Sequence, residues 1–437
     1  MLRVCLALPV FYPTFAGGSL RFLHYQPGLR KRDIQARVLT GTARPRDDLH
    51  PGARPTPESP IGTRLAVDQI DGIPVHRIQL PERTGPRRTS VFFRALIELC
   101  QNPATRPDLI QLHSFERLES LYWIPRLARL GVPIVYAIQI AKPLSRVSWP
   151  LRAQKRRMLR RFYSGFDGIV TSSETIESAL RCLGIRTPIA VIPNGVDLGR
   201  FAPRSEEERG SARRRLGLEP DCPVLLSVGA ISPRKGADLL VEAWTEVLER
   251  HPTTRLLLVG PRHDRNHPRL ARFRARLESS IRRSGRPDQV HLLGIREDLP
   301  DLYAASDLVV LPSAREGGTP NVMLEAMACG RPVLASPFEG QSKALGRPGI
   351  EFEQCRRTPA ALARSIDPLL ADPARRRRLA KAGRSWVVRH LDLETSLDRF
   401  AGFYRGIDDW KRATGACPFP GTDPFETRVT PAAWPPR

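Results

Sequence analysis

The stretch EGGTPNVMLEAMACGRPVLAS, residues Glu316–Ser336, reads in order as a loop, a helix, a turn and a strand. The pair Gly317–Gly318 interrupts regular structure, and Thr319–Pro320 is typical of a helix start with Pro in the first helical position. Gly330 suits the residue just after a helix, and RPVLAS is short and apolar enough for a buried parallel strand. The stretch therefore predicts a helix that leads into a strand of a parallel sheet.

The same alternation of strand and helix runs along the whole chain. RVCLALPV and DLIQLHS in the first half, and PVLLSVGA and DLVVLPS in the second, are short apolar strands followed by helix-like segments. Strands of this kind are typical of parallel sheets that helices cover on both faces. A polar, turn-rich segment, NGVDLGRFAPRSEEERG, separates the two halves. We therefore predict an α/β chain with two doubly wound domains that face each other across a cleft, where ligands bind at the carboxyl ends of the strands.

The length, charge and residue composition of the chain limit the classes of function that it can have. The chain of 437 residues is long enough for two domains, and its net charge of +24 comes almost entirely from Arg. Aromatic residues are 7% and no RRM, helix-turn-helix or zinc signature is present, so the charge favours an anionic membrane surface or a phosphorylated ligand over nucleic acid. The seven Cys form no metal-spaced cluster, which indicates a reducing compartment. The N-terminal apolar run is broken by Pro9 and Pro13, so we interpret it as a strand and a loop; no apolar run is long enough to cross a bilayer.

Four segments together resemble glycosyltransferase family 4. They are FAGGS after the first strand, IPNGVD at the boundary, LLSVGAISPRKG at the start of the second half, and EGGTPNVMLEAMACGRPV. The resemblance extends from Arg3 to about Asp408. It implies the GT-B fold, a nucleotide-sugar donor, and transfer with retention of the anomeric configuration.

The resemblance also assigns roles to the two halves. We expect an N-terminal Rossmann-like domain on the acceptor side, residues 1–197, and a C-terminal nucleotide-sugar-binding domain, residues 198–412. The last helix is expected to cross back to the N-terminal domain, and the Pro-rich residues 413–437 to be irregular.

A nucleotide-sugar carries a diphosphate that gains negative charge as the glycosidic bond breaks. SPRKGADLL places Arg234 and Lys235 on a loop that enters a helix, where cations and backbone N–H groups can meet one phosphate. The alternative is a solvated basic turn. The helix that begins at Thr319, Pro320 and Asn321 offers N–H groups for the other phosphate. The resemblance implies a site that neutralises this charge without a metal, and no convincing DxD follows a strand, so we expect no metal. We expect no cofactor, because the nucleotide-sugar is itself a substrate.

The family resemblance also assigns the two carboxylates of the opening stretch. Glu325 is placed to accept hydrogen bonds from the ribose of the donor, and Glu316 to approach the transferred sugar. The pair Gly17–Gly18 would let the backbone approach the donor and the acceptor.

Three residues depart from the family pattern. Eight residues instead of seven separate Glu316 from Glu325, Ala230 stands where the family has Arg, and Gln139 stands where many members have a catalytic-site His. Arg234 could compensate for Ala230, and Gln139 could hydrogen-bond a sugar hydroxyl without carrying charge. His113, at another strand end, could be structural or face the cleft.

These departures leave a second function open. An active transferase would need Lys235, Arg234, Glu316 and Gln139 in its catalytic site, whereas a non-catalytic GT-B protein would only bind nucleotide or glycan. Steady release of nucleotide in the presence of an acceptor would separate the two.

One basic segment is relevant to whether the acceptor is lipid-linked. It is WPLRAQKRRMLRRFYSGF, residues 149–166. It carries six cations and an apolar strip of Met158, Leu159, Phe162 and Tyr163. A helix of this kind could lie on an anionic membrane, as in relatives that glycosylate lipid-linked acceptors, or pack its strip on the N-terminal sheet. We therefore expect a cytoplasmic protein and leave open whether it lies on the cytoplasmic membrane.

Overall fold

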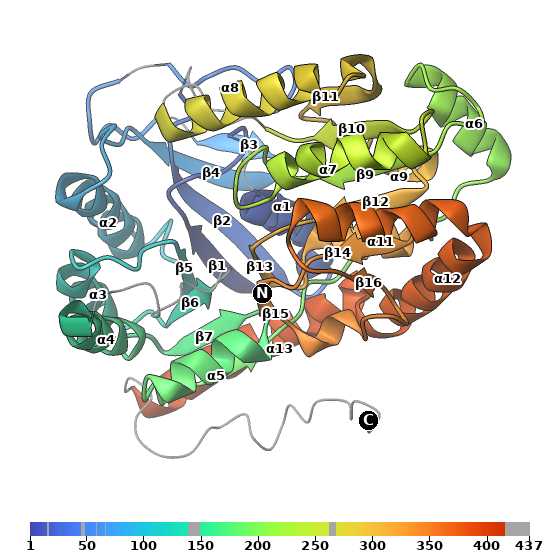
Figure 1. The fold of residues 1–437 in the computed structure, drawn as a ribbon. Helices are drawn as coiled ribbons and strands as arrows, with labels where there is room; N and C mark the ends of the chain where they lie inside the picture. Colours follow the sequence, from blue (N-terminus) through green and yellow to red (C-terminus); the bar gives the residue numbers. More distant parts are fainter. Residues whose placement is uncertain are drawn as a thin grey trace.

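The computed structural model describes residues 1–14, 17–44, 49–57, 59–65, 67–138, 149–261 and 268–415. Two separate sheets organise this part of the chain, one in each half (Figure 1). Both are flanked by helices, so the predicted α/β architecture with two doubly wound units is confirmed.

The first sheet has eight strands in the order β3-β4-β2-β1-β5-β6-β7-β8. Its paired neighbours run parallel except β3 and β4, which are antiparallel at one edge, so the prediction of a purely parallel sheet is wrong there. Strands β3 and β4 are joined by a tight turn at Asp71 and Gly72, both with positive φ, and a connection this short only permits an antiparallel pair. The strands are β1 (Leu2–Ala7), β2 (Ile34–Gly41), β3 (Asp68–Ile70), β4 (Ile73–Ile78), β5 (Leu109–His113), β6 (Ile134–Ile138), β7 (Gly168–Thr171) and β8 (Ile189–Val191).

Helices cover the two faces of this sheet unequally. One face packs against a core that includes α2 (Pro86–Gln101), α3 (Ser120–Ala128), α4 (Trp149–Tyr163) and α5 (Glu174–Cys182). The other face packs against α1 (Gly17–Arg30) and α13 (Leu393–Thr414).

The second sheet has six strands in the order β11-β10-β9-β12-β14-β16, and its pairs are parallel. They are β9 (Val224–Val228), β10 (Arg255–Val259), β11 (Val290–Gly294), β12 (Leu308–Leu311), β14 (Val333–Ala335) and β16 (Glu353–Gln354). Strands β13 (Arg315–Gly318) and β15 (Glu339–Gln341) form a separate pair. The helices are α6 (Glu206–Arg215), α7 (Ala237–Arg250), α8 (Pro268–Arg283), α9 (Leu299–Ala305), α10 (Asn321–Ala328), α11 (Pro359–Ala371) and α12 (Pro373–His390).

The opening stretch folds as predicted except before and at the start of its helix. Residues 316–318, predicted as a loop, belong to strand β13, because they pair with β15. Strand β14 and the left-handed Gly330 (φ 66°) after α10 lie where the sequence places them. Pro320 is the N-cap residue rather than the first helical residue, and it provides no side-chain cap. The hydroxyl of Thr319 does not cap the helix either, because it accepts a hydrogen bond from the backbone N–H of Asn194. A contact with the other half of the chain thus takes the place of a local cap.

Helix α13 returns from the second half and packs on the first sheet (Figure 1). Its Tyr404 hydroxyl donates to Gln111 Oε1 at 2.6 Å, and Lys411 Nζ lies 2.8 Å from Asp167 Oδ1. The helix continues through Thr414, two residues past the helix end that the sequence predicts, and ends at a left-handed Gly415. The remaining tail lies outside the described residues.

Replacing Lys411 with Met should destabilise the fold strongly. Both partners are buried, and Asp167 also accepts a hydrogen bond from the backbone N–H of Ile134, so the change leaves a buried carboxylate without its cation. Breaking such a pair costs about 3–5 kcal/mol. Guanidinium unfolding measures it, with Arg204→Met as the control because Arg204 pairs with Glu208 on the surface. Equal costs for the two variants would contradict the prediction.

The position of helix α4 shows where the apolar strip of segment 149–166 packs. Leu159, Phe162 and Tyr163 are buried in the core beneath the first sheet, and Met158 packs against it. The apolar strip therefore belongs to the core, and an interpretation in which this strip enters a membrane is wrong. The Arg side chains at 156, 157, 160 and 161 are exposed. Within the described ranges, no helix is both long and apolar enough to cross a membrane.

Candidate functional site at the junction of the two halves

The loop after β9 brings two cations onto one carboxylate. Lys235 Nζ lies 2.5 Å from Glu316 Oε1, and Arg234 Nη1 lies 3.4 Å from Glu316 Oε2. Arg234 also donates to the backbone carbonyl of Arg315 at 2.7 Å. Burial opposes the charge of Glu316, but the two cations outweigh it and hold the pKa of its carboxyl below the ordinary value. Arg234, Lys235 and Glu316 thus form one charged cluster, which we call the Glu316 cluster.

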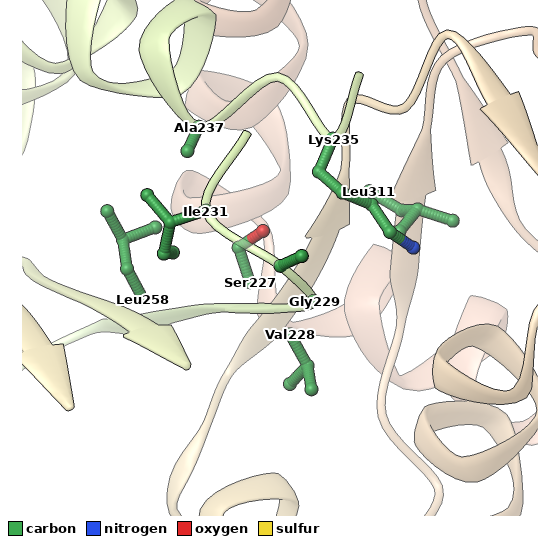
Figure 2. Close-up of a pocket in the computed structure, with 9 residues that line it drawn as sticks. Ser227, Val228, Gly229, Ile231, Lys235, Ala237, Leu258 and Leu311 are labelled. Carbon is green, nitrogen blue, oxygen red and sulfur yellow. The ribbon is translucent and has the colours of Figure 1, made fainter. Parts of the chain in front are cut away.

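Two glycines shape the loop that carries these cations. Gly229 follows β9 with φ 148°, and Gly236 precedes α7 with φ 77°. A Cβ at Gly236 would lie 2.3 Å from the carbonyl oxygen of Pro312, so a larger residue would displace the loop. Figure 2 shows Lys235 on the opposite side of the small pocket from Leu258. This pocket has a volume of about 10 Å³, which suits about one water molecule.

Glu325 lies apart from that cluster, in the body of α10. The hydroxyl of Tyr303 donates to Glu325 Oε2 at 2.7 Å. Burial raises the pKa of Glu325 above its ordinary value, while the Tyr303 hydrogen bond and the charge of Arg200 act in the other direction. The carboxylate is therefore held in one orientation by a partner that leaves other lone pairs available.

A cavity of about 240 Å³ lies between the two halves, and Glu325 is among the residues that line it. Residues 192–205, between β8 and α6, form a linker between the two halves. The wall of the cavity includes Arg21, His24 and Tyr25 of α1, Arg200 of the linker, and Asn321 and Glu325 of α10. Cations and carboxylates thus line one space that both halves share, at the place where the fold predicts a ligand.

The other residues selected from the sequence are distributed around this junction. Gly17 and Gly18 form the start of α1. Thr319 is fully buried, and Asn321 lines the cavity. Gln139 lies outside the described residues.

The additional glycine of the opening stretch has a structural reason. The β13–β15 pairing is irregular between Arg315 and Gly318, so the extra residue is absorbed as a bulge. Gly318 has φ 53°, and a Cβ there would lie 1.9 Å from the carbonyl oxygen of Ser172 in the first half. The glycine therefore permits a close approach of the two halves beside Glu316.

His113 is buried, which favours its structural interpretation. Its ring packs edge-on against Phe22 at 4.8 Å, and Nε2 lies 2.8 Å from Gln111 Nε2. Burial, with a smaller contribution from the charge of Arg21, lowers the pKa of His113 to about 3. The ring is thus neutral at physiological pH.

Sequence reasoning missed four residues of the junction. Tyr303, Arg200, Asn194 and Arg21 contact or neighbour residues of the predicted site, yet none was singled out. Asn194 lies in the IPNGVD segment, so the family resemblance could have identified it. Tyr303 and Arg21 lie in no such segment, and only the folded structure brings them to their partners.

Comparison with known proteins identifies the class. Residues 16–195 match the model of a "Glycosyl transferase 4-like domain", and residues 222–372 match that of "Glycosyl transferases group 1". The structure superposes on sucrose-phosphate synthase from Thermosynechococcus elongatus with a TM-score of 0.73 and 22% identity, covering 94% of this chain and 100% of that one. The chain therefore has the GT-B fold.

Two curated relatives show to which family the chain belongs. A D-inositol 3-phosphate glycosyltransferase of Thermomonospora curvata is 30% identical over 331 residues, which span 69% of this chain and 74% of the relative. A GDP-mannose-dependent monoacylated alpha-(1-6)-phosphatidylinositol monomannoside mannosyltransferase of Corynebacterium glutamicum is 29% identical over 252 residues. That match spans 55% of this chain and 62% of the relative, less than two thirds of its length. The chain belongs to glycosyltransferase family 4 and is a glycosyltransferase.

Proposed function

We propose that this protein is a retaining glycosyltransferase that moves a sugar from a nucleotide-sugar to a hydroxyl acceptor without a metal or other cofactor. The observation that carries the proposal is the Glu316 cluster, in which two cations meet on one carboxylate. An inter-half cavity that Glu325 lines supports it. Residues 1–197 would bind the acceptor, and residues 198–412 the donor.

The charges at the junction fit this chemistry. As the bond between the anomeric carbon and the phosphate oxygen breaks, negative charge grows on the departing diphosphate. Lys235 and Arg234 can neutralise that charge, and the free N–H groups at the start of α10 can stabilise it further. The acceptor oxygen bonds to the anomeric carbon on the same face, and its proton passes to the departing phosphate. No protein nucleophile is needed in this scheme.

The names of the relatives suggest the substrates to test. One relative is GDP-mannose-dependent and acts on a phosphatidylinositol mannoside, and another is named for inositol 3-phosphate. Both acceptors combine a polyol with a phosphate. We therefore propose a phosphorylated, inositol-type acceptor, which agrees with the strongly basic chain.

A donor screen followed by a turnover assay tests this function. GDP-mannose, UDP-glucose and other nucleotide-sugars are compared by thermal shift, where a ligand at a hundredfold its Kd stabilises by about 2.7 kcal/mol. The best donor should then release nucleotide steadily only when an inositol phosphate or phosphatidylinositol acceptor is present, and EDTA should not change the rate. Binding without turnover on any acceptor would instead support a non-catalytic binding protein.

A lipid-linked acceptor would bring the enzyme to the cytoplasmic membrane, and α3 and α4 offer a surface for it. Leu118 and Tyr122 are 68% and 55% exposed, and the guanidinium of Arg126 lies 3.3 Å from the centre of the Tyr122 ring. The adjacent α4 presents the Arg side chains at 156, 157, 160 and 161 to solvent. We propose that this outer face, rather than the buried strip of α4, contacts anionic lipid.

Vesicle sedimentation should show binding through that face. Wild type should pellet with phosphatidylglycerol vesicles at low salt and be released at high salt, because each cation near such a surface contributes about 1 kcal/mol. Replacing the four α4 Arg with Gln should abolish pelleting. The control replaces four exposed Arg of α8, at 269, 272, 276 and 283, and should still pellet. Equal behaviour of the two variants, or no pelleting of wild type, would refute this surface.

A further inference from the structure

The linker residue Asn194 binds the segment that leads into α10. It follows β8 and is 7% exposed. Its backbone N–H donates to Thr319 Oγ1 at 2.7 Å, and its side-chain Nδ2 donates to the Thr319 carbonyl at 2.7 Å. Thr319 is fully buried and immediately precedes the N-cap residue Pro320. Two short hydrogen bonds thus fix the peptide from which α10 starts.

Arg21 determines how the side chain of Asn194 is turned. Its Nη1 donates to Asn194 Oδ1. A guanidinium only donates, so the atom that faces it must be the carbonyl oxygen, and the amide nitrogen is left to donate to Thr319. The Arg21 guanidinium also lies over the rings of Phe22 and Tyr25, at 4.8 and 5.9 Å. These contacts hold the guanidinium in one place.

Arg21 also brings an unbalanced charge to the junction. In the described part of the chain no carboxylate pairs with it, and its buried Nε has no hydrogen-bond partner. Burial lowers the pKa of the guanidinium, and the nearby Tyr25 and Tyr404 hydroxyls offset only part of this effect. Arg21 is half-buried, and removing a cation from water without a counter-charge is costly. Arg21 lies one turn after Gly17 in α1 and lines the same cavity as Asn321. The charge of Arg21 therefore adds to the partial positive charge of the α10 N-terminus.

We infer that Arg21 and Asn194 are positioning residues that fix the N-terminus of α10 for the diphosphate of the donor; the inference rests on the proposed transferase function. Arg21 orients the Asn194 amide, Asn194 fixes Thr319, and Thr319 sets the direction of the free N–H groups of Asn321 and Val322. Because Arg21 belongs to the first half and Thr319 to the second, the same contacts also place α1 relative to the diphosphate site.

Asn194→Asp tests the inference with little change in size. Asp can still accept from Arg21 but cannot donate to the Thr319 carbonyl, and it adds a negative charge beside the phosphate site. We expect GDP or UDP, whichever wild type binds, to bind at least tenfold more weakly, while the corresponding nucleoside binds within twofold of wild type. The KM for the donor should rise by a similar factor, and the KM for the acceptor should not.

Thr319→Val provides a second, independent variant. It keeps the size of the side chain and removes the acceptor for the Asn194 N–H, so it should also weaken diphosphate binding selectively. Ser396→Ala is the matched control, because Ser396 Oγ donates at 3.0 Å to the carbonyl of Pro193, the residue before Asn194, and not to Thr319. It should lower Tm without changing the ratio of diphosphate to nucleoside affinity.

The outcomes distinguish failure of the positioning role from failure of the proposed transferase function. If wild type binds GDP or UDP but Asn194→Asp and Thr319→Val only lower Tm, as Ser396→Ala does, the contacts are structural and the inference is wrong. If wild type binds neither GDP nor UDP, the proposed function fails and the inference fails with it.

Discussion

Replacing Lys235 with Ala is expected to lower the rate of sugar transfer by about a hundredfold or more, as loss of a group that stabilises a departing charge usually does. The ammonium group lies 2.5 Å from Glu316 Oε1, and the guanidinium of Arg234 lies 3.4 Å from Glu316 Oε2. Initial rates at saturating donor measure the effect. Lys381→Ala, on the exposed surface of α12, should leave the rate unchanged. A Lys235→Ala enzyme with more than a tenth of the wild-type rate would remove Lys235 from the catalytic mechanism.

Arg234→Ala, measured in the same assay, shows whether Arg234 replaces the Arg that the family has in place of Ala230. Arg234 and Lys235 reach the same carboxylate, which is the geometry that compensation requires. If Arg234 compensates, its loss should be nearly as severe as that of Lys235. A mild Arg234→Ala beside a severe Lys235→Ala would mean that the diphosphate is neutralised by Lys235 and by α10 alone.

The local features of the fold could be predicted from the sequence because they depend on local periodicity. Strand β14 and Gly330 follow from short-range patterns, and the two-domain fold follows from their repetition along the chain. The start of α10 could not be predicted in the same way. Its Thr319 is held by Asn194, 125 positions away, and a local capping rule has no access to such a contact.

The candidate site could also be predicted only in part, because local sequence patterns identify its residues but not the contacts between them. The segments that carry Lys235, Glu316 and Glu325 have recognisable spacing, but their pairing does not follow from spacing. That Lys235 bonds to Glu316, while Glu325 bonds to Tyr303, depends on how β13 and α9 pack. Likewise, the amphipathic pattern of α4 is compatible with lipid or with a core, and only the position of the helix over the first sheet decides between them.

Glu325→Ala is expected to abolish transfer and to weaken nucleotide binding by about ten- to a hundredfold. The family resemblance gives this carboxylate the ribose hydroxyls, and each buried hydroxyl left without a partner costs about 1–3 kcal/mol. Glu316→Ala should instead leave nucleotide binding within a few-fold of wild type and reduce turnover, since Glu316 is expected to approach the transferred sugar. Calorimetric titration with the nucleoside diphosphate and initial-rate kinetics together separate the two roles.

Tyr303→Phe and pH complete this test of Glu325. Removing the Tyr303 hydroxyl deletes the hydrogen bond that orients the carboxylate but leaves its charge, so the loss of affinity should be smaller than for Glu325→Ala. Burial raises the pKa of Glu325, and ribose hydroxyls bind best to the ionised form. Nucleotide affinity should therefore fall as pH falls through this raised pKa, and the fall should be absent in Glu325→Ala. If Glu325→Ala binds nucleotide and turns over like wild type, Glu325 has no part in donor binding.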